Sequence, residues 1–237
     1  MASLYLNPSI ESAVVGATVA LEPDEAKHAT TVARARVGER LSIGNGRGLI
    51  VSGTVSALDP FALLVDEVHV EPVASPQLWL VQALAKGDRD ELAVQAATEL
   101  GVTGVVPWAA ERSVTRWDGP KLEKGRVRWQ SIVREASKQA LRGWVPQVEP
   151  LVTTAAIAGD VVLVLDPTAE LALTSVALPE QGRIALVVGP EGGISPRELE
   201  LLEQQGARRV RLGAAILRTS TAGPAAIAVL NARLGRW

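Results

Sequence analysis

Cysteine is absent from this chain of 237 residues, and histidine occurs only at His28 and His69. The lack of cysteine excludes a disulfide framework, a cysteine-ligated zinc site and a thiol nucleophile. Because both histidines lie in the N-terminal region, the sequence also offers no Cys/His cluster with the spacing of metal ligands. We therefore predict that the protein binds no metal.

Long apolar runs are missing too: no stretch reaches the roughly 18 residues that a membrane-spanning helix needs. The first residues, MASLYLNPSIES, lack the basic stretch followed by an apolar segment that marks a signal peptide. We expect a cytoplasmic protein with no membrane partner. Hydrophobic residues make up 47% of the chain, which is enough for the core of one large or two small domains.

Charge of one sign does not dominate, because the net charge is only −2. That value argues mildly against a nucleic-acid partner, but the basic residues are clustered. Residues 112–142 hold nine Lys or Arg against three acids, residues 27–48 hold five against one, and residues 208–218 hold four and no acid. A single cluster could be a solvated surface, whereas three clusters favour a surface that binds a polyanion.

The pattern of hydrophobic residues divides the chain near residue 72. Residues 1–72 are predicted to form a small β-barrel, with an Asn-Gly hairpin turn within Gly44–Gly48 and a short helix at 23–36. After the Pro-containing linker 71–76, apolar strands alternate with amphipathic helices, which predicts an α/β domain with a parallel sheet over 73–237. The predicted strands are 78–85, 105–106, 161–165, 184–188 and 210–212, and the predicted helices begin near 88, 127, 195 and 222.

Two glycine-containing loops near the C-terminus are the best candidates for a binding site. VVGPEGGIS (187–195) and LGAAILRTSTAGPAAIAVL (212–230) each predict a strand, a tight loop and a helix. Ligands of open α/β sheets bind where strands end and loops begin, so one site built from both loops is expected. Glycines at 189, 192, 193 and 213 would let the backbone approach a ligand and adopt positive φ, unless each only makes a tight turn. Neither loop is a P-loop or a dinucleotide fingerprint.

Five segments together carry a resemblance to a known family. They are VGPEGGIS (188–195), LGAAILRTSTA (212–222), KGDRDELAVQAATELGV (86–102), ERSV (111–114) and REASKQALR (134–142). The chain resembles the RsmE-type 16S ribosomal RNA uridine-N3 methyltransferases of the SPOUT superfamily. The resemblance implies a PUA-like RNA-binding barrel, an α/β domain with a trefoil knot, S-adenosyl-L-methionine as cofactor, a homodimer, and 16S ribosomal RNA or the small ribosomal subunit as partner.

The resemblance also assigns residues to the two binding sites. Ser220 stands where the family commonly has Glu, so an acidic role is not expected there. The implied cofactor-binding residues are Gly189, Pro190, Glu191, Gly192, Gly193, Leu212, Gly213, Ile216, Leu217, Arg218, Thr219 and Thr221. Leu165, followed by Asp166 and Pro167, ends another predicted strand and is a further candidate for the border of the pocket. The implied RNA-binding residues are His28, Arg34, Arg36, Lys86, Arg89, Arg112, Gln139 and Arg142. Trp108, Trp117, Trp129 and Trp144 could stack on bases, although tryptophans beside helices belong more often to a core.

Methylation of uracil at N3 requires removal of the N3 proton, by a base or with help from a cation that stabilises the uracil anion. Since no histidine or cysteine lies near the loops, Glu191 as base and Arg218 as anion stabiliser are the candidate catalytic residues. Glu191 could instead accept hydrogen bonds from loop backbone, and Arg218 could pair with an acid. Two other functions stay open: a methyltransferase acting on another RNA or atom, and a non-catalytic RNA-binding module.

Overall fold

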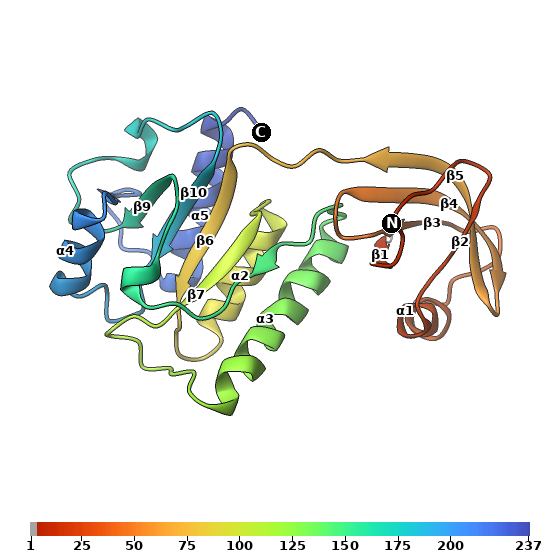
Figure 1. Ribbon diagram of the computed structural model, residues 1–237, viewed down its shortest axis with the longest axis horizontal. Helices are drawn as coiled ribbons and strands as arrows, with labels where there is room; N and C mark the ends of the chain where they lie inside the picture. The colour runs from red at the N-terminus through yellow and green to blue at the C-terminus, as the bar shows by residue number, and fades with distance from the viewer. Residues whose placement is uncertain (1–3) are drawn as a thin grey trace. The chain divides into compact units, whose positions relative to one another are not determined.

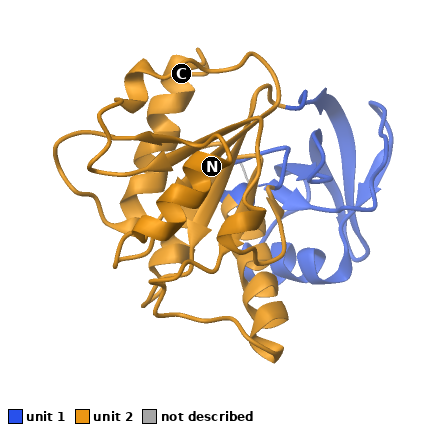
Figure 2. Cartoon of the chain, turned by 60° about the vertical axis from the view of Figure 1, so that its left-hand side comes forward, with its two compact units in different colours: residues 1–73, 137–145 blue, residues 74–136, 146–237 orange. Residues whose placement is uncertain are grey.

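The computed structural model describes residues 4–237, which form two compact units (Figure 2). Unit 1 comprises the chain up to Val73 together with Ser137–Val145. Unit 2 comprises Ala74–Ala136 and Pro146–Trp237. The division near residue 73 follows the predicted linker, whereas the sequence did not indicate that residues 137–145 belong to unit 1.

Unit 1 is built on a curled five-stranded sheet in the order β1-β3-β4-β5-β2. Buried and exposed positions alternate along β4 and β5, so one face of the sheet covers a core that includes Ile43, Val51 and Leu63. The predicted hairpin joins β3 to β4, and the Asn45 side chain closes it by accepting hydrogen bonds from the backbone of Arg47 and Leu49. The strands are β1 (Leu4–Leu6), β2 (Thr18–Ala20), β3 (Arg40–Gly44), β4 (Leu49–Leu58) and β5 (Phe61–Val70).

The helix predicted at 23–36 ends early, which corrects the sequence analysis. Helix α1 (Pro23–Lys27) continues as a π-helical turn, η1 (His28–Val32), and Arg34 then adopts a left-handed conformation with φ of 57°. The Thr30 hydroxyl donates to the backbone carbonyl of Ala26 at 2.9 Å. Side-chain bonds of this kind compete with regular helical bonding, and the left-handed residue ends the helical path.

Residues 137–145 are held within unit 1 by buried polar contacts. Lys138 Nζ lies 3.2 Å from Glu25 Oε1, and both side chains are only 9% exposed. The Trp144 indole donates to the Glu71 carbonyl at 2.9 Å, and its ring packs against Gly48, where a Cβ atom would lie within 2.8 Å of it. A late segment of the chain is therefore part of the core of the N-terminal unit.

Unit 2 contains a six-stranded sheet in the order β11-β9-β10-β6-β7-β8, and every pair of neighbouring strands is parallel. The central strands β6 and β10 are buried along nearly their whole length, as expected for strands covered on both faces. The predicted parallel α/β domain is confirmed. The strands are β6 (Gln77–Ala83), β7 (Gly104–Trp108), β8 (Gln147–Val148), β9 (Val161–Leu165), β10 (Arg183–Val188) and β11 (Arg208–Val210).

Helices cover both faces of this sheet (Figure 1). Helices α2 (Arg89–Glu99) and α5 (Thr219–Arg233) pack together and against β6, and α5 also contacts β10. Leu202 of α4 (Pro196–Gln204) joins the core on the other face. Helix α3 (Pro120–Gln139) begins seven residues before the predicted start.

After the edge strand β11, the chain returns across the sheet to α5, which lies behind the central strands. The trefoil knot that the resemblance implies depends on how this return is threaded, and it stays a prediction. Two minor elements complete unit 2: the 3-10 turns η2 (Thr154–Ala156) and η3 (Leu173–Ser175).

Candidate active site

A cavity of about 560 Å³ lies where strands β9 and β10 end and where the chain returns to α5. Three loops meet there: residues 166–168 after β9, residues 189–194 after β10, and residues 212–218 before α5, and the adjoining Leu165 and Thr219 also line the cavity. A parallel sheet places the carboxyl ends of neighbouring strands at one edge, so loops distant in sequence form one site. The two glycine loops do come together, as the sequence predicted.

Most of the predicted cofactor residues line this cavity. Gly192 and Thr221 do not, whereas Arg89, predicted for RNA binding, does. The predicted residues that line it are Leu165, Gly189, Pro190, Glu191, Gly193, Leu212, Gly213, Ile216, Leu217, Arg218 and Thr219. Sequence reasoning missed Thr168, Val188, Ile194, Leu199, Ala215 and Ala222; all but Thr168 and Leu199 lie within the two recognised segments, which was the available signal.

The loop before α5 presents free backbone to the cavity. No backbone N–H or C=O of residues 212–217 makes a hydrogen bond within the described part of the chain. An added Cβ at Gly213 would meet no atom within 4 Å, and Ile216 is 82% exposed. These six residues therefore offer unsatisfied backbone groups and apolar side chains, which suit a flat heterocycle with polar edges.

The loop after β10 is held by close backbone packing. Gly193 has φ of 71°, and its N–H donates to the Pro190 carbonyl. The expectation of positive φ is wrong for Gly189, Gly192 and Gly213, which adopt ordinary backbone angles. At Gly189 the absence of a side chain instead permits close approach, because a Cβ would lie 2.7 Å from Ile194.

Glu191 is anchored to the loop that follows β6. Its Oε1 accepts from the Lys86 backbone N–H at 2.9 Å and from Arg89 Nη1 at 3.0 Å. Burial alone would raise the pKa of Glu191, but these hydrogen bonds, its own backbone N–H and the Arg89 charge outweigh burial and hold the pKa below its usual value. Glu191 is therefore an ionised loop anchor at neutral pH, as the alternative interpretation of the sequence held.

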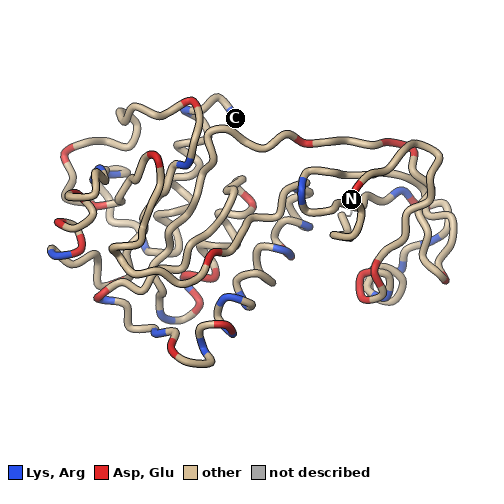
Figure 3. Tube along the Cα trace, viewed as in Figure 1, with Lys and Arg blue, Asp and Glu red and all other residues tan. Residues whose placement is uncertain are grey.

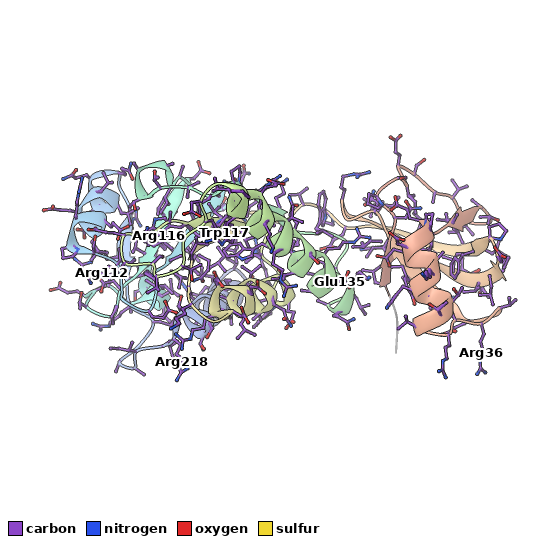
Figure 4. The ribbon with its side chains drawn as sticks, turned by 90° about the horizontal axis from the view of Figure 1, so that it is seen from below. Arg36, Arg112, Arg116, Trp117, Glu135 and Arg218 are labelled. Atoms are coloured by element: carbon purple, nitrogen blue, oxygen red, sulfur yellow. The ribbon has the colours of Figure 1, made fainter. Side chains whose placement is uncertain are left out.

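The loop after β7 is anchored to the same glycine loop. Arg112 Nη1 donates to the Gly192 carbonyl at 3.1 Å, and the Ser195 hydroxyl lies 2.5 Å from Glu111 Oε2. Ser195 also caps α4 by accepting from the Glu198 backbone N–H. Since β10, β6 and β7 are neighbours in the sheet, the glycine loop is bonded to the loops of the next two strands. Figure 4 labels Arg112 among the side chains of unit 2.

Asp166 and Arg218 both line the cavity but differ in their partners, because Asp166 is paired with Arg209 at 2.7 Å. Burial would raise the pKa of Asp166, but hydrogen bonds from Thr168 and Arg209 and the charge of Arg209 outweigh it, so its pKa is lowered. Arg218 is the N-cap residue of α5, is exposed, and points away from the ribbon in Figure 4. Within residues 4–237, no acidic side chain forms an ion pair with Arg218, so its guanidinium is available to a ligand.

Sequence models of two domains match this chain. One, described as an RNA methyltransferase domain, matches residues 73–231, and another, described as an RNA methyltransferase PUA domain, matches residues 21–67. The first match covers more than half of the chain. The chain belongs to the RNA methyltransferase family. The predicted family resemblance is thereby confirmed.

Relatives of this RNA methyltransferase agree in sequence and in fold. Ribosomal RNA small subunit methyltransferase E of Mycobacterium bovis is 39% identical and covers 94% of this chain and 89% of its own. The Bacillus subtilis protein of that name is 29% identical, with 90% of each chain covered. The crystal structure of the Neisseria gonorrhoeae protein bound to S-adenosyl methionine has a TM-score of 0.86 at 28% identity over 98% of both chains. A Legionella pneumophila methyltransferase in complex with the bound cofactor SAM has a TM-score of 0.83 at 27% identity, with 98% of this chain and 97% of its own covered.

The residues predicted to bind RNA differ in how accessible they are in this methyltransferase. His28, Arg34 and Arg36 of unit 1 are exposed, as is Gln139. Arg142 is half-buried, and burial lowers its pKa to about 10 although the nearby Glu71 carboxylate opposes the shift. In unit 2, Lys86 and Arg112 are exposed, and Arg89 is half-exposed beside Glu191.

Several tryptophans and basic residues have structural partners, which corrects two expectations. Trp108 and Trp129 are fully buried and cannot stack on a base without unfolding, and Trp117 packs edge-on against Trp129. Along α3, where Figure 3 shows the Lys and Arg positions, Arg128 pairs with Glu91 at 2.8 Å. The basic cluster at 112–142 is therefore partly neutralised.

Residues 4–237 contain no cluster of three His, Asp or Glu side chains arranged to hold a metal ion. None of the helices in this range is long and apolar enough to cross a membrane.

Proposed function

We propose that this protein transfers a methyl group from S-adenosylmethionine to N3 of a uridine in 16S ribosomal RNA of the small subunit. The observation that carries the proposal is the cavity between the two glycine loops, in a fold shared over almost the whole chain with a methyltransferase crystallised with S-adenosyl methionine. The curated relatives named for the small-subunit ribosomal RNA support the substrate class.

The residues of the cavity fit this cofactor. Unbonded backbone groups of residues 212–217 suit the polar edge of adenine, and Ile216 and Leu217 supply an apolar wall. Asp166 and Glu191 are both ionised beside the cavity, and because each is paired with an arginine (Arg209 and Arg89), they offer a sulfonium or ammonium group only part of their charge. When bound, S-adenosylmethionine supplies an electrophilic methyl group whose leaving group needs little assistance.

The protein's chemical task is to accommodate the uracil anion. The N3 proton passes to solvent water, and the negative charge that it leaves spreads over the two neighbouring carbonyl oxygens, where a nearby cation stabilises it. Arg218 is suited to this role because it lines the cavity, is exposed and has no acidic partner in the described range. Glu191, already holding Arg89 and the Lys86 backbone, serves the loop rather than the proton transfer in this proposal.

Basic and polar residues are assigned to RNA, all of them outside the cavity except Arg89, which lines it. In unit 1 we assign His28, Arg34, Arg36, Gln139 and Arg142, and in unit 2 Lys86, Arg89 and Arg112. An exposed basic surface strengthens binding to RNA phosphates, because binding releases the counterions that the phosphates had condensed. The match to an RNA methyltransferase PUA domain over residues 21–67 supports the assignment for unit 1.

A homodimer in the cytoplasm completes the proposal. Helix α5 carries apolar residues on most of its faces, with small alanine side chains that allow close approach of another helix. Light scattering of the purified chain at micromolar concentration tests this assembly, and a monomeric mass would contradict it.

The decisive experiment is mass spectrometry of ribosomal RNA nucleosides from cells with and without the gene. We expect N3-methyluridine to disappear from 16S RNA when the gene is removed and to return with the wild-type chain. Complementation with Arg218→Ala should restore little N3-methyluridine. In single-turnover assays with saturating RNA and cofactor, we expect the methyl-transfer rate of this variant to fall at least about 100-fold.

Each other outcome points to a different function. Loss of another methylated nucleoside would reassign the atom or the RNA. Unchanged nucleosides, together with RNA binding that does not depend on S-adenosylmethionine, would leave a non-catalytic RNA-binding module. An Arg218→Ala enzyme working at the parental rate would remove the role given to Arg218.

A further inference from the structure

Gln82 is a fully buried polar side chain at the end of β6 that no step of the proposed reaction uses. In the sheet it lies beside Val188, the last residue of β10, so it stands next to the start of the glycine loop. Its amide nitrogen donates to the Ala83 carbonyl at 3.1 Å and to the Thr219 hydroxyl at 2.8 Å. Gln82 does not line the cavity, whereas Thr219 and Gly189 do.

The direction of these hydrogen bonds follows from the number of protons that each group can donate. A threonine hydroxyl has one proton to donate and lone pairs to accept. Because Gln82 Nε2 donates to the Thr219 oxygen, the Thr219 proton is directed to the Gly189 carbonyl, which lies 2.8 Å away. The result is a chain of two hydrogen bonds with one direction of donation, from Gln82 to Thr219 and from Thr219 to Gly189, which we call the Gln82 relay.

This relay connects the two loops of the cavity to the sheet. Gly189 begins the loop after β10, and Thr219 is the first residue of α5, directly after the loop 212–218. We propose that Gln82 is a positioning residue for the cofactor site: by orienting the Thr219 hydroxyl it fixes the separation of the two loops before a ligand arrives. The inference rests on the proposed function and adds a residue outside the cavity to it.

Stability alone does not account for an amide at this position. Gln82 Oε1 is buried and has no hydrogen-bond partner among the described residues, and a buried oxygen left unpaired destabilises the fold. Exchanging the amide ends would place an oxygen against the Ala83 carbonyl, so the observed orientation is the favourable one. An apolar side chain of similar size would fill the space without that unpaired oxygen. It would, however, no longer donate to the Thr219 hydroxyl, whose orientation toward the Gly189 carbonyl would then not be fixed.

The test measures S-adenosylmethionine affinity by calorimetry on the full chain, with thermal unfolding of each variant as a separate readout. We expect Gln82→Met to weaken binding roughly five- to tenfold, as for one lost buried hydrogen bond, while its unfolding temperature stays equal or rises. Thr219→Val should weaken binding by a similar factor. Thr219→Ser, which keeps the hydroxyl, should bind within about twofold of the parent.

The double variant separates a relay from two independent contacts. If the relay acts as a unit, Gln82→Met combined with Thr219→Val should bind no worse than Thr219→Val alone. Losses that multiply, or unchanged affinity in either single variant, would overturn the inference while the proposed function stands. If Gln82→Met does not fold, Gln82→Leu replaces it in the single and double variants, and the same outcomes decide. A parent chain that binds no S-adenosylmethionine would overturn the proposed function and the relay together.

Discussion

At the scale of single residues, the two candidate catalytic residues, Glu191 and Arg218, differ in the partners that the fold gives them. Both line the cavity, but Glu191 is bonded to the backbone of Lys86 and to Arg89, whereas Arg218 has no acidic partner in residues 4–237. A carboxylate with a lowered pKa is a weak base for an N–H as weakly acidic as that of uracil. The local partners, rather than the residue type, therefore decide which of the two suits catalysis.

A pH experiment distinguishes the anchor from the base. Because the folded-state pKa of Glu191 lies below the usual glutamate value of 4.5, its anchoring contribution is complete above that value and is lost only as the pH falls through the folded pKa. We expect Glu191→Gln to weaken cofactor binding, yet to leave the shape of the rate profile unchanged over roughly pH 6 to 9. Quenched single-turnover assays across that pH range measure the rate profile of the parent and of the variant. Loss of an ionisation from the profile of the variant would instead identify Glu191 as the base.

At the scale of elements, the site is a property of strand ends. The loops after β6, β7 and β10 are tied together by Glu191 and Arg112, and the loop before α5 is tied to β10 through Thr219. Residues 212–217, by contrast, make no backbone hydrogen bond in the described structure. The hydrogen-bonded loops after β6, β7 and β10 therefore face a loop whose backbone polar groups are free to bind a ligand.

Filling the open space beside that loop should block the cofactor without disturbing the fold. Gly213 has ordinary backbone angles and open space around it, so we expect Gly213→Trp to fold normally and to lose at least about 100-fold in affinity for S-adenosylmethionine. Ala214→Trp is the matched control, because Ala214 is exposed and does not line the cavity. Equal affinities in the two variants, measured by calorimetry, would place the cofactor elsewhere.

At the scale of the whole molecule, the N-terminal unit depends on a segment that follows it by more than sixty residues. The buried contact between Lys138 and Glu25 is part of that dependence. Breaking a buried ion pair by removing one partner leaves the other charge desolvated, which is strongly destabilising. Unit 1 is therefore completed only after α3 has been made.

Replacing one side of this buried pair should destabilise the protein markedly. We expect Lys138→Met to reduce the free energy of unfolding by about 3–5 kcal/mol, measured by urea denaturation followed by circular dichroism. Lys124→Met, at an exposed position of the same helix, should change it by less than about 0.5 kcal/mol. Similar values for the two variants would show that the Lys138 charge contributes little to unit 1.

Local patterns predicted the elements of this protein well, and the exceptions have physical causes. Apolar runs identified β6, β7, β9 and β10, because side-chain periodicity depends only on neighbouring residues. The short strands β1, β2 and β8 were not predicted, and β11 begins two residues before its predicted start. The helix at 23–36 was predicted too long, since nothing in its composition signals the π-helical turn or the left-handed Arg34. The amphipathic pattern of α3 continues without a break through residues 136 and 137, so it gives no sign that the helix passes from one unit to the other.

The sequence by itself determined the two-part organisation, the parallel α/β class and the two loops that form the cavity, because turn residues and periodicity act locally. Only the tertiary structure decided which groups meet around those loops. Glu191 and Lys86 are separated by 105 residues, and Gln82 and Thr219 by 137. They are neighbours because the spatial order β10-β6-β7 differs from the order along the chain, and strand order is fixed by packing of the whole sheet rather than by any local pattern.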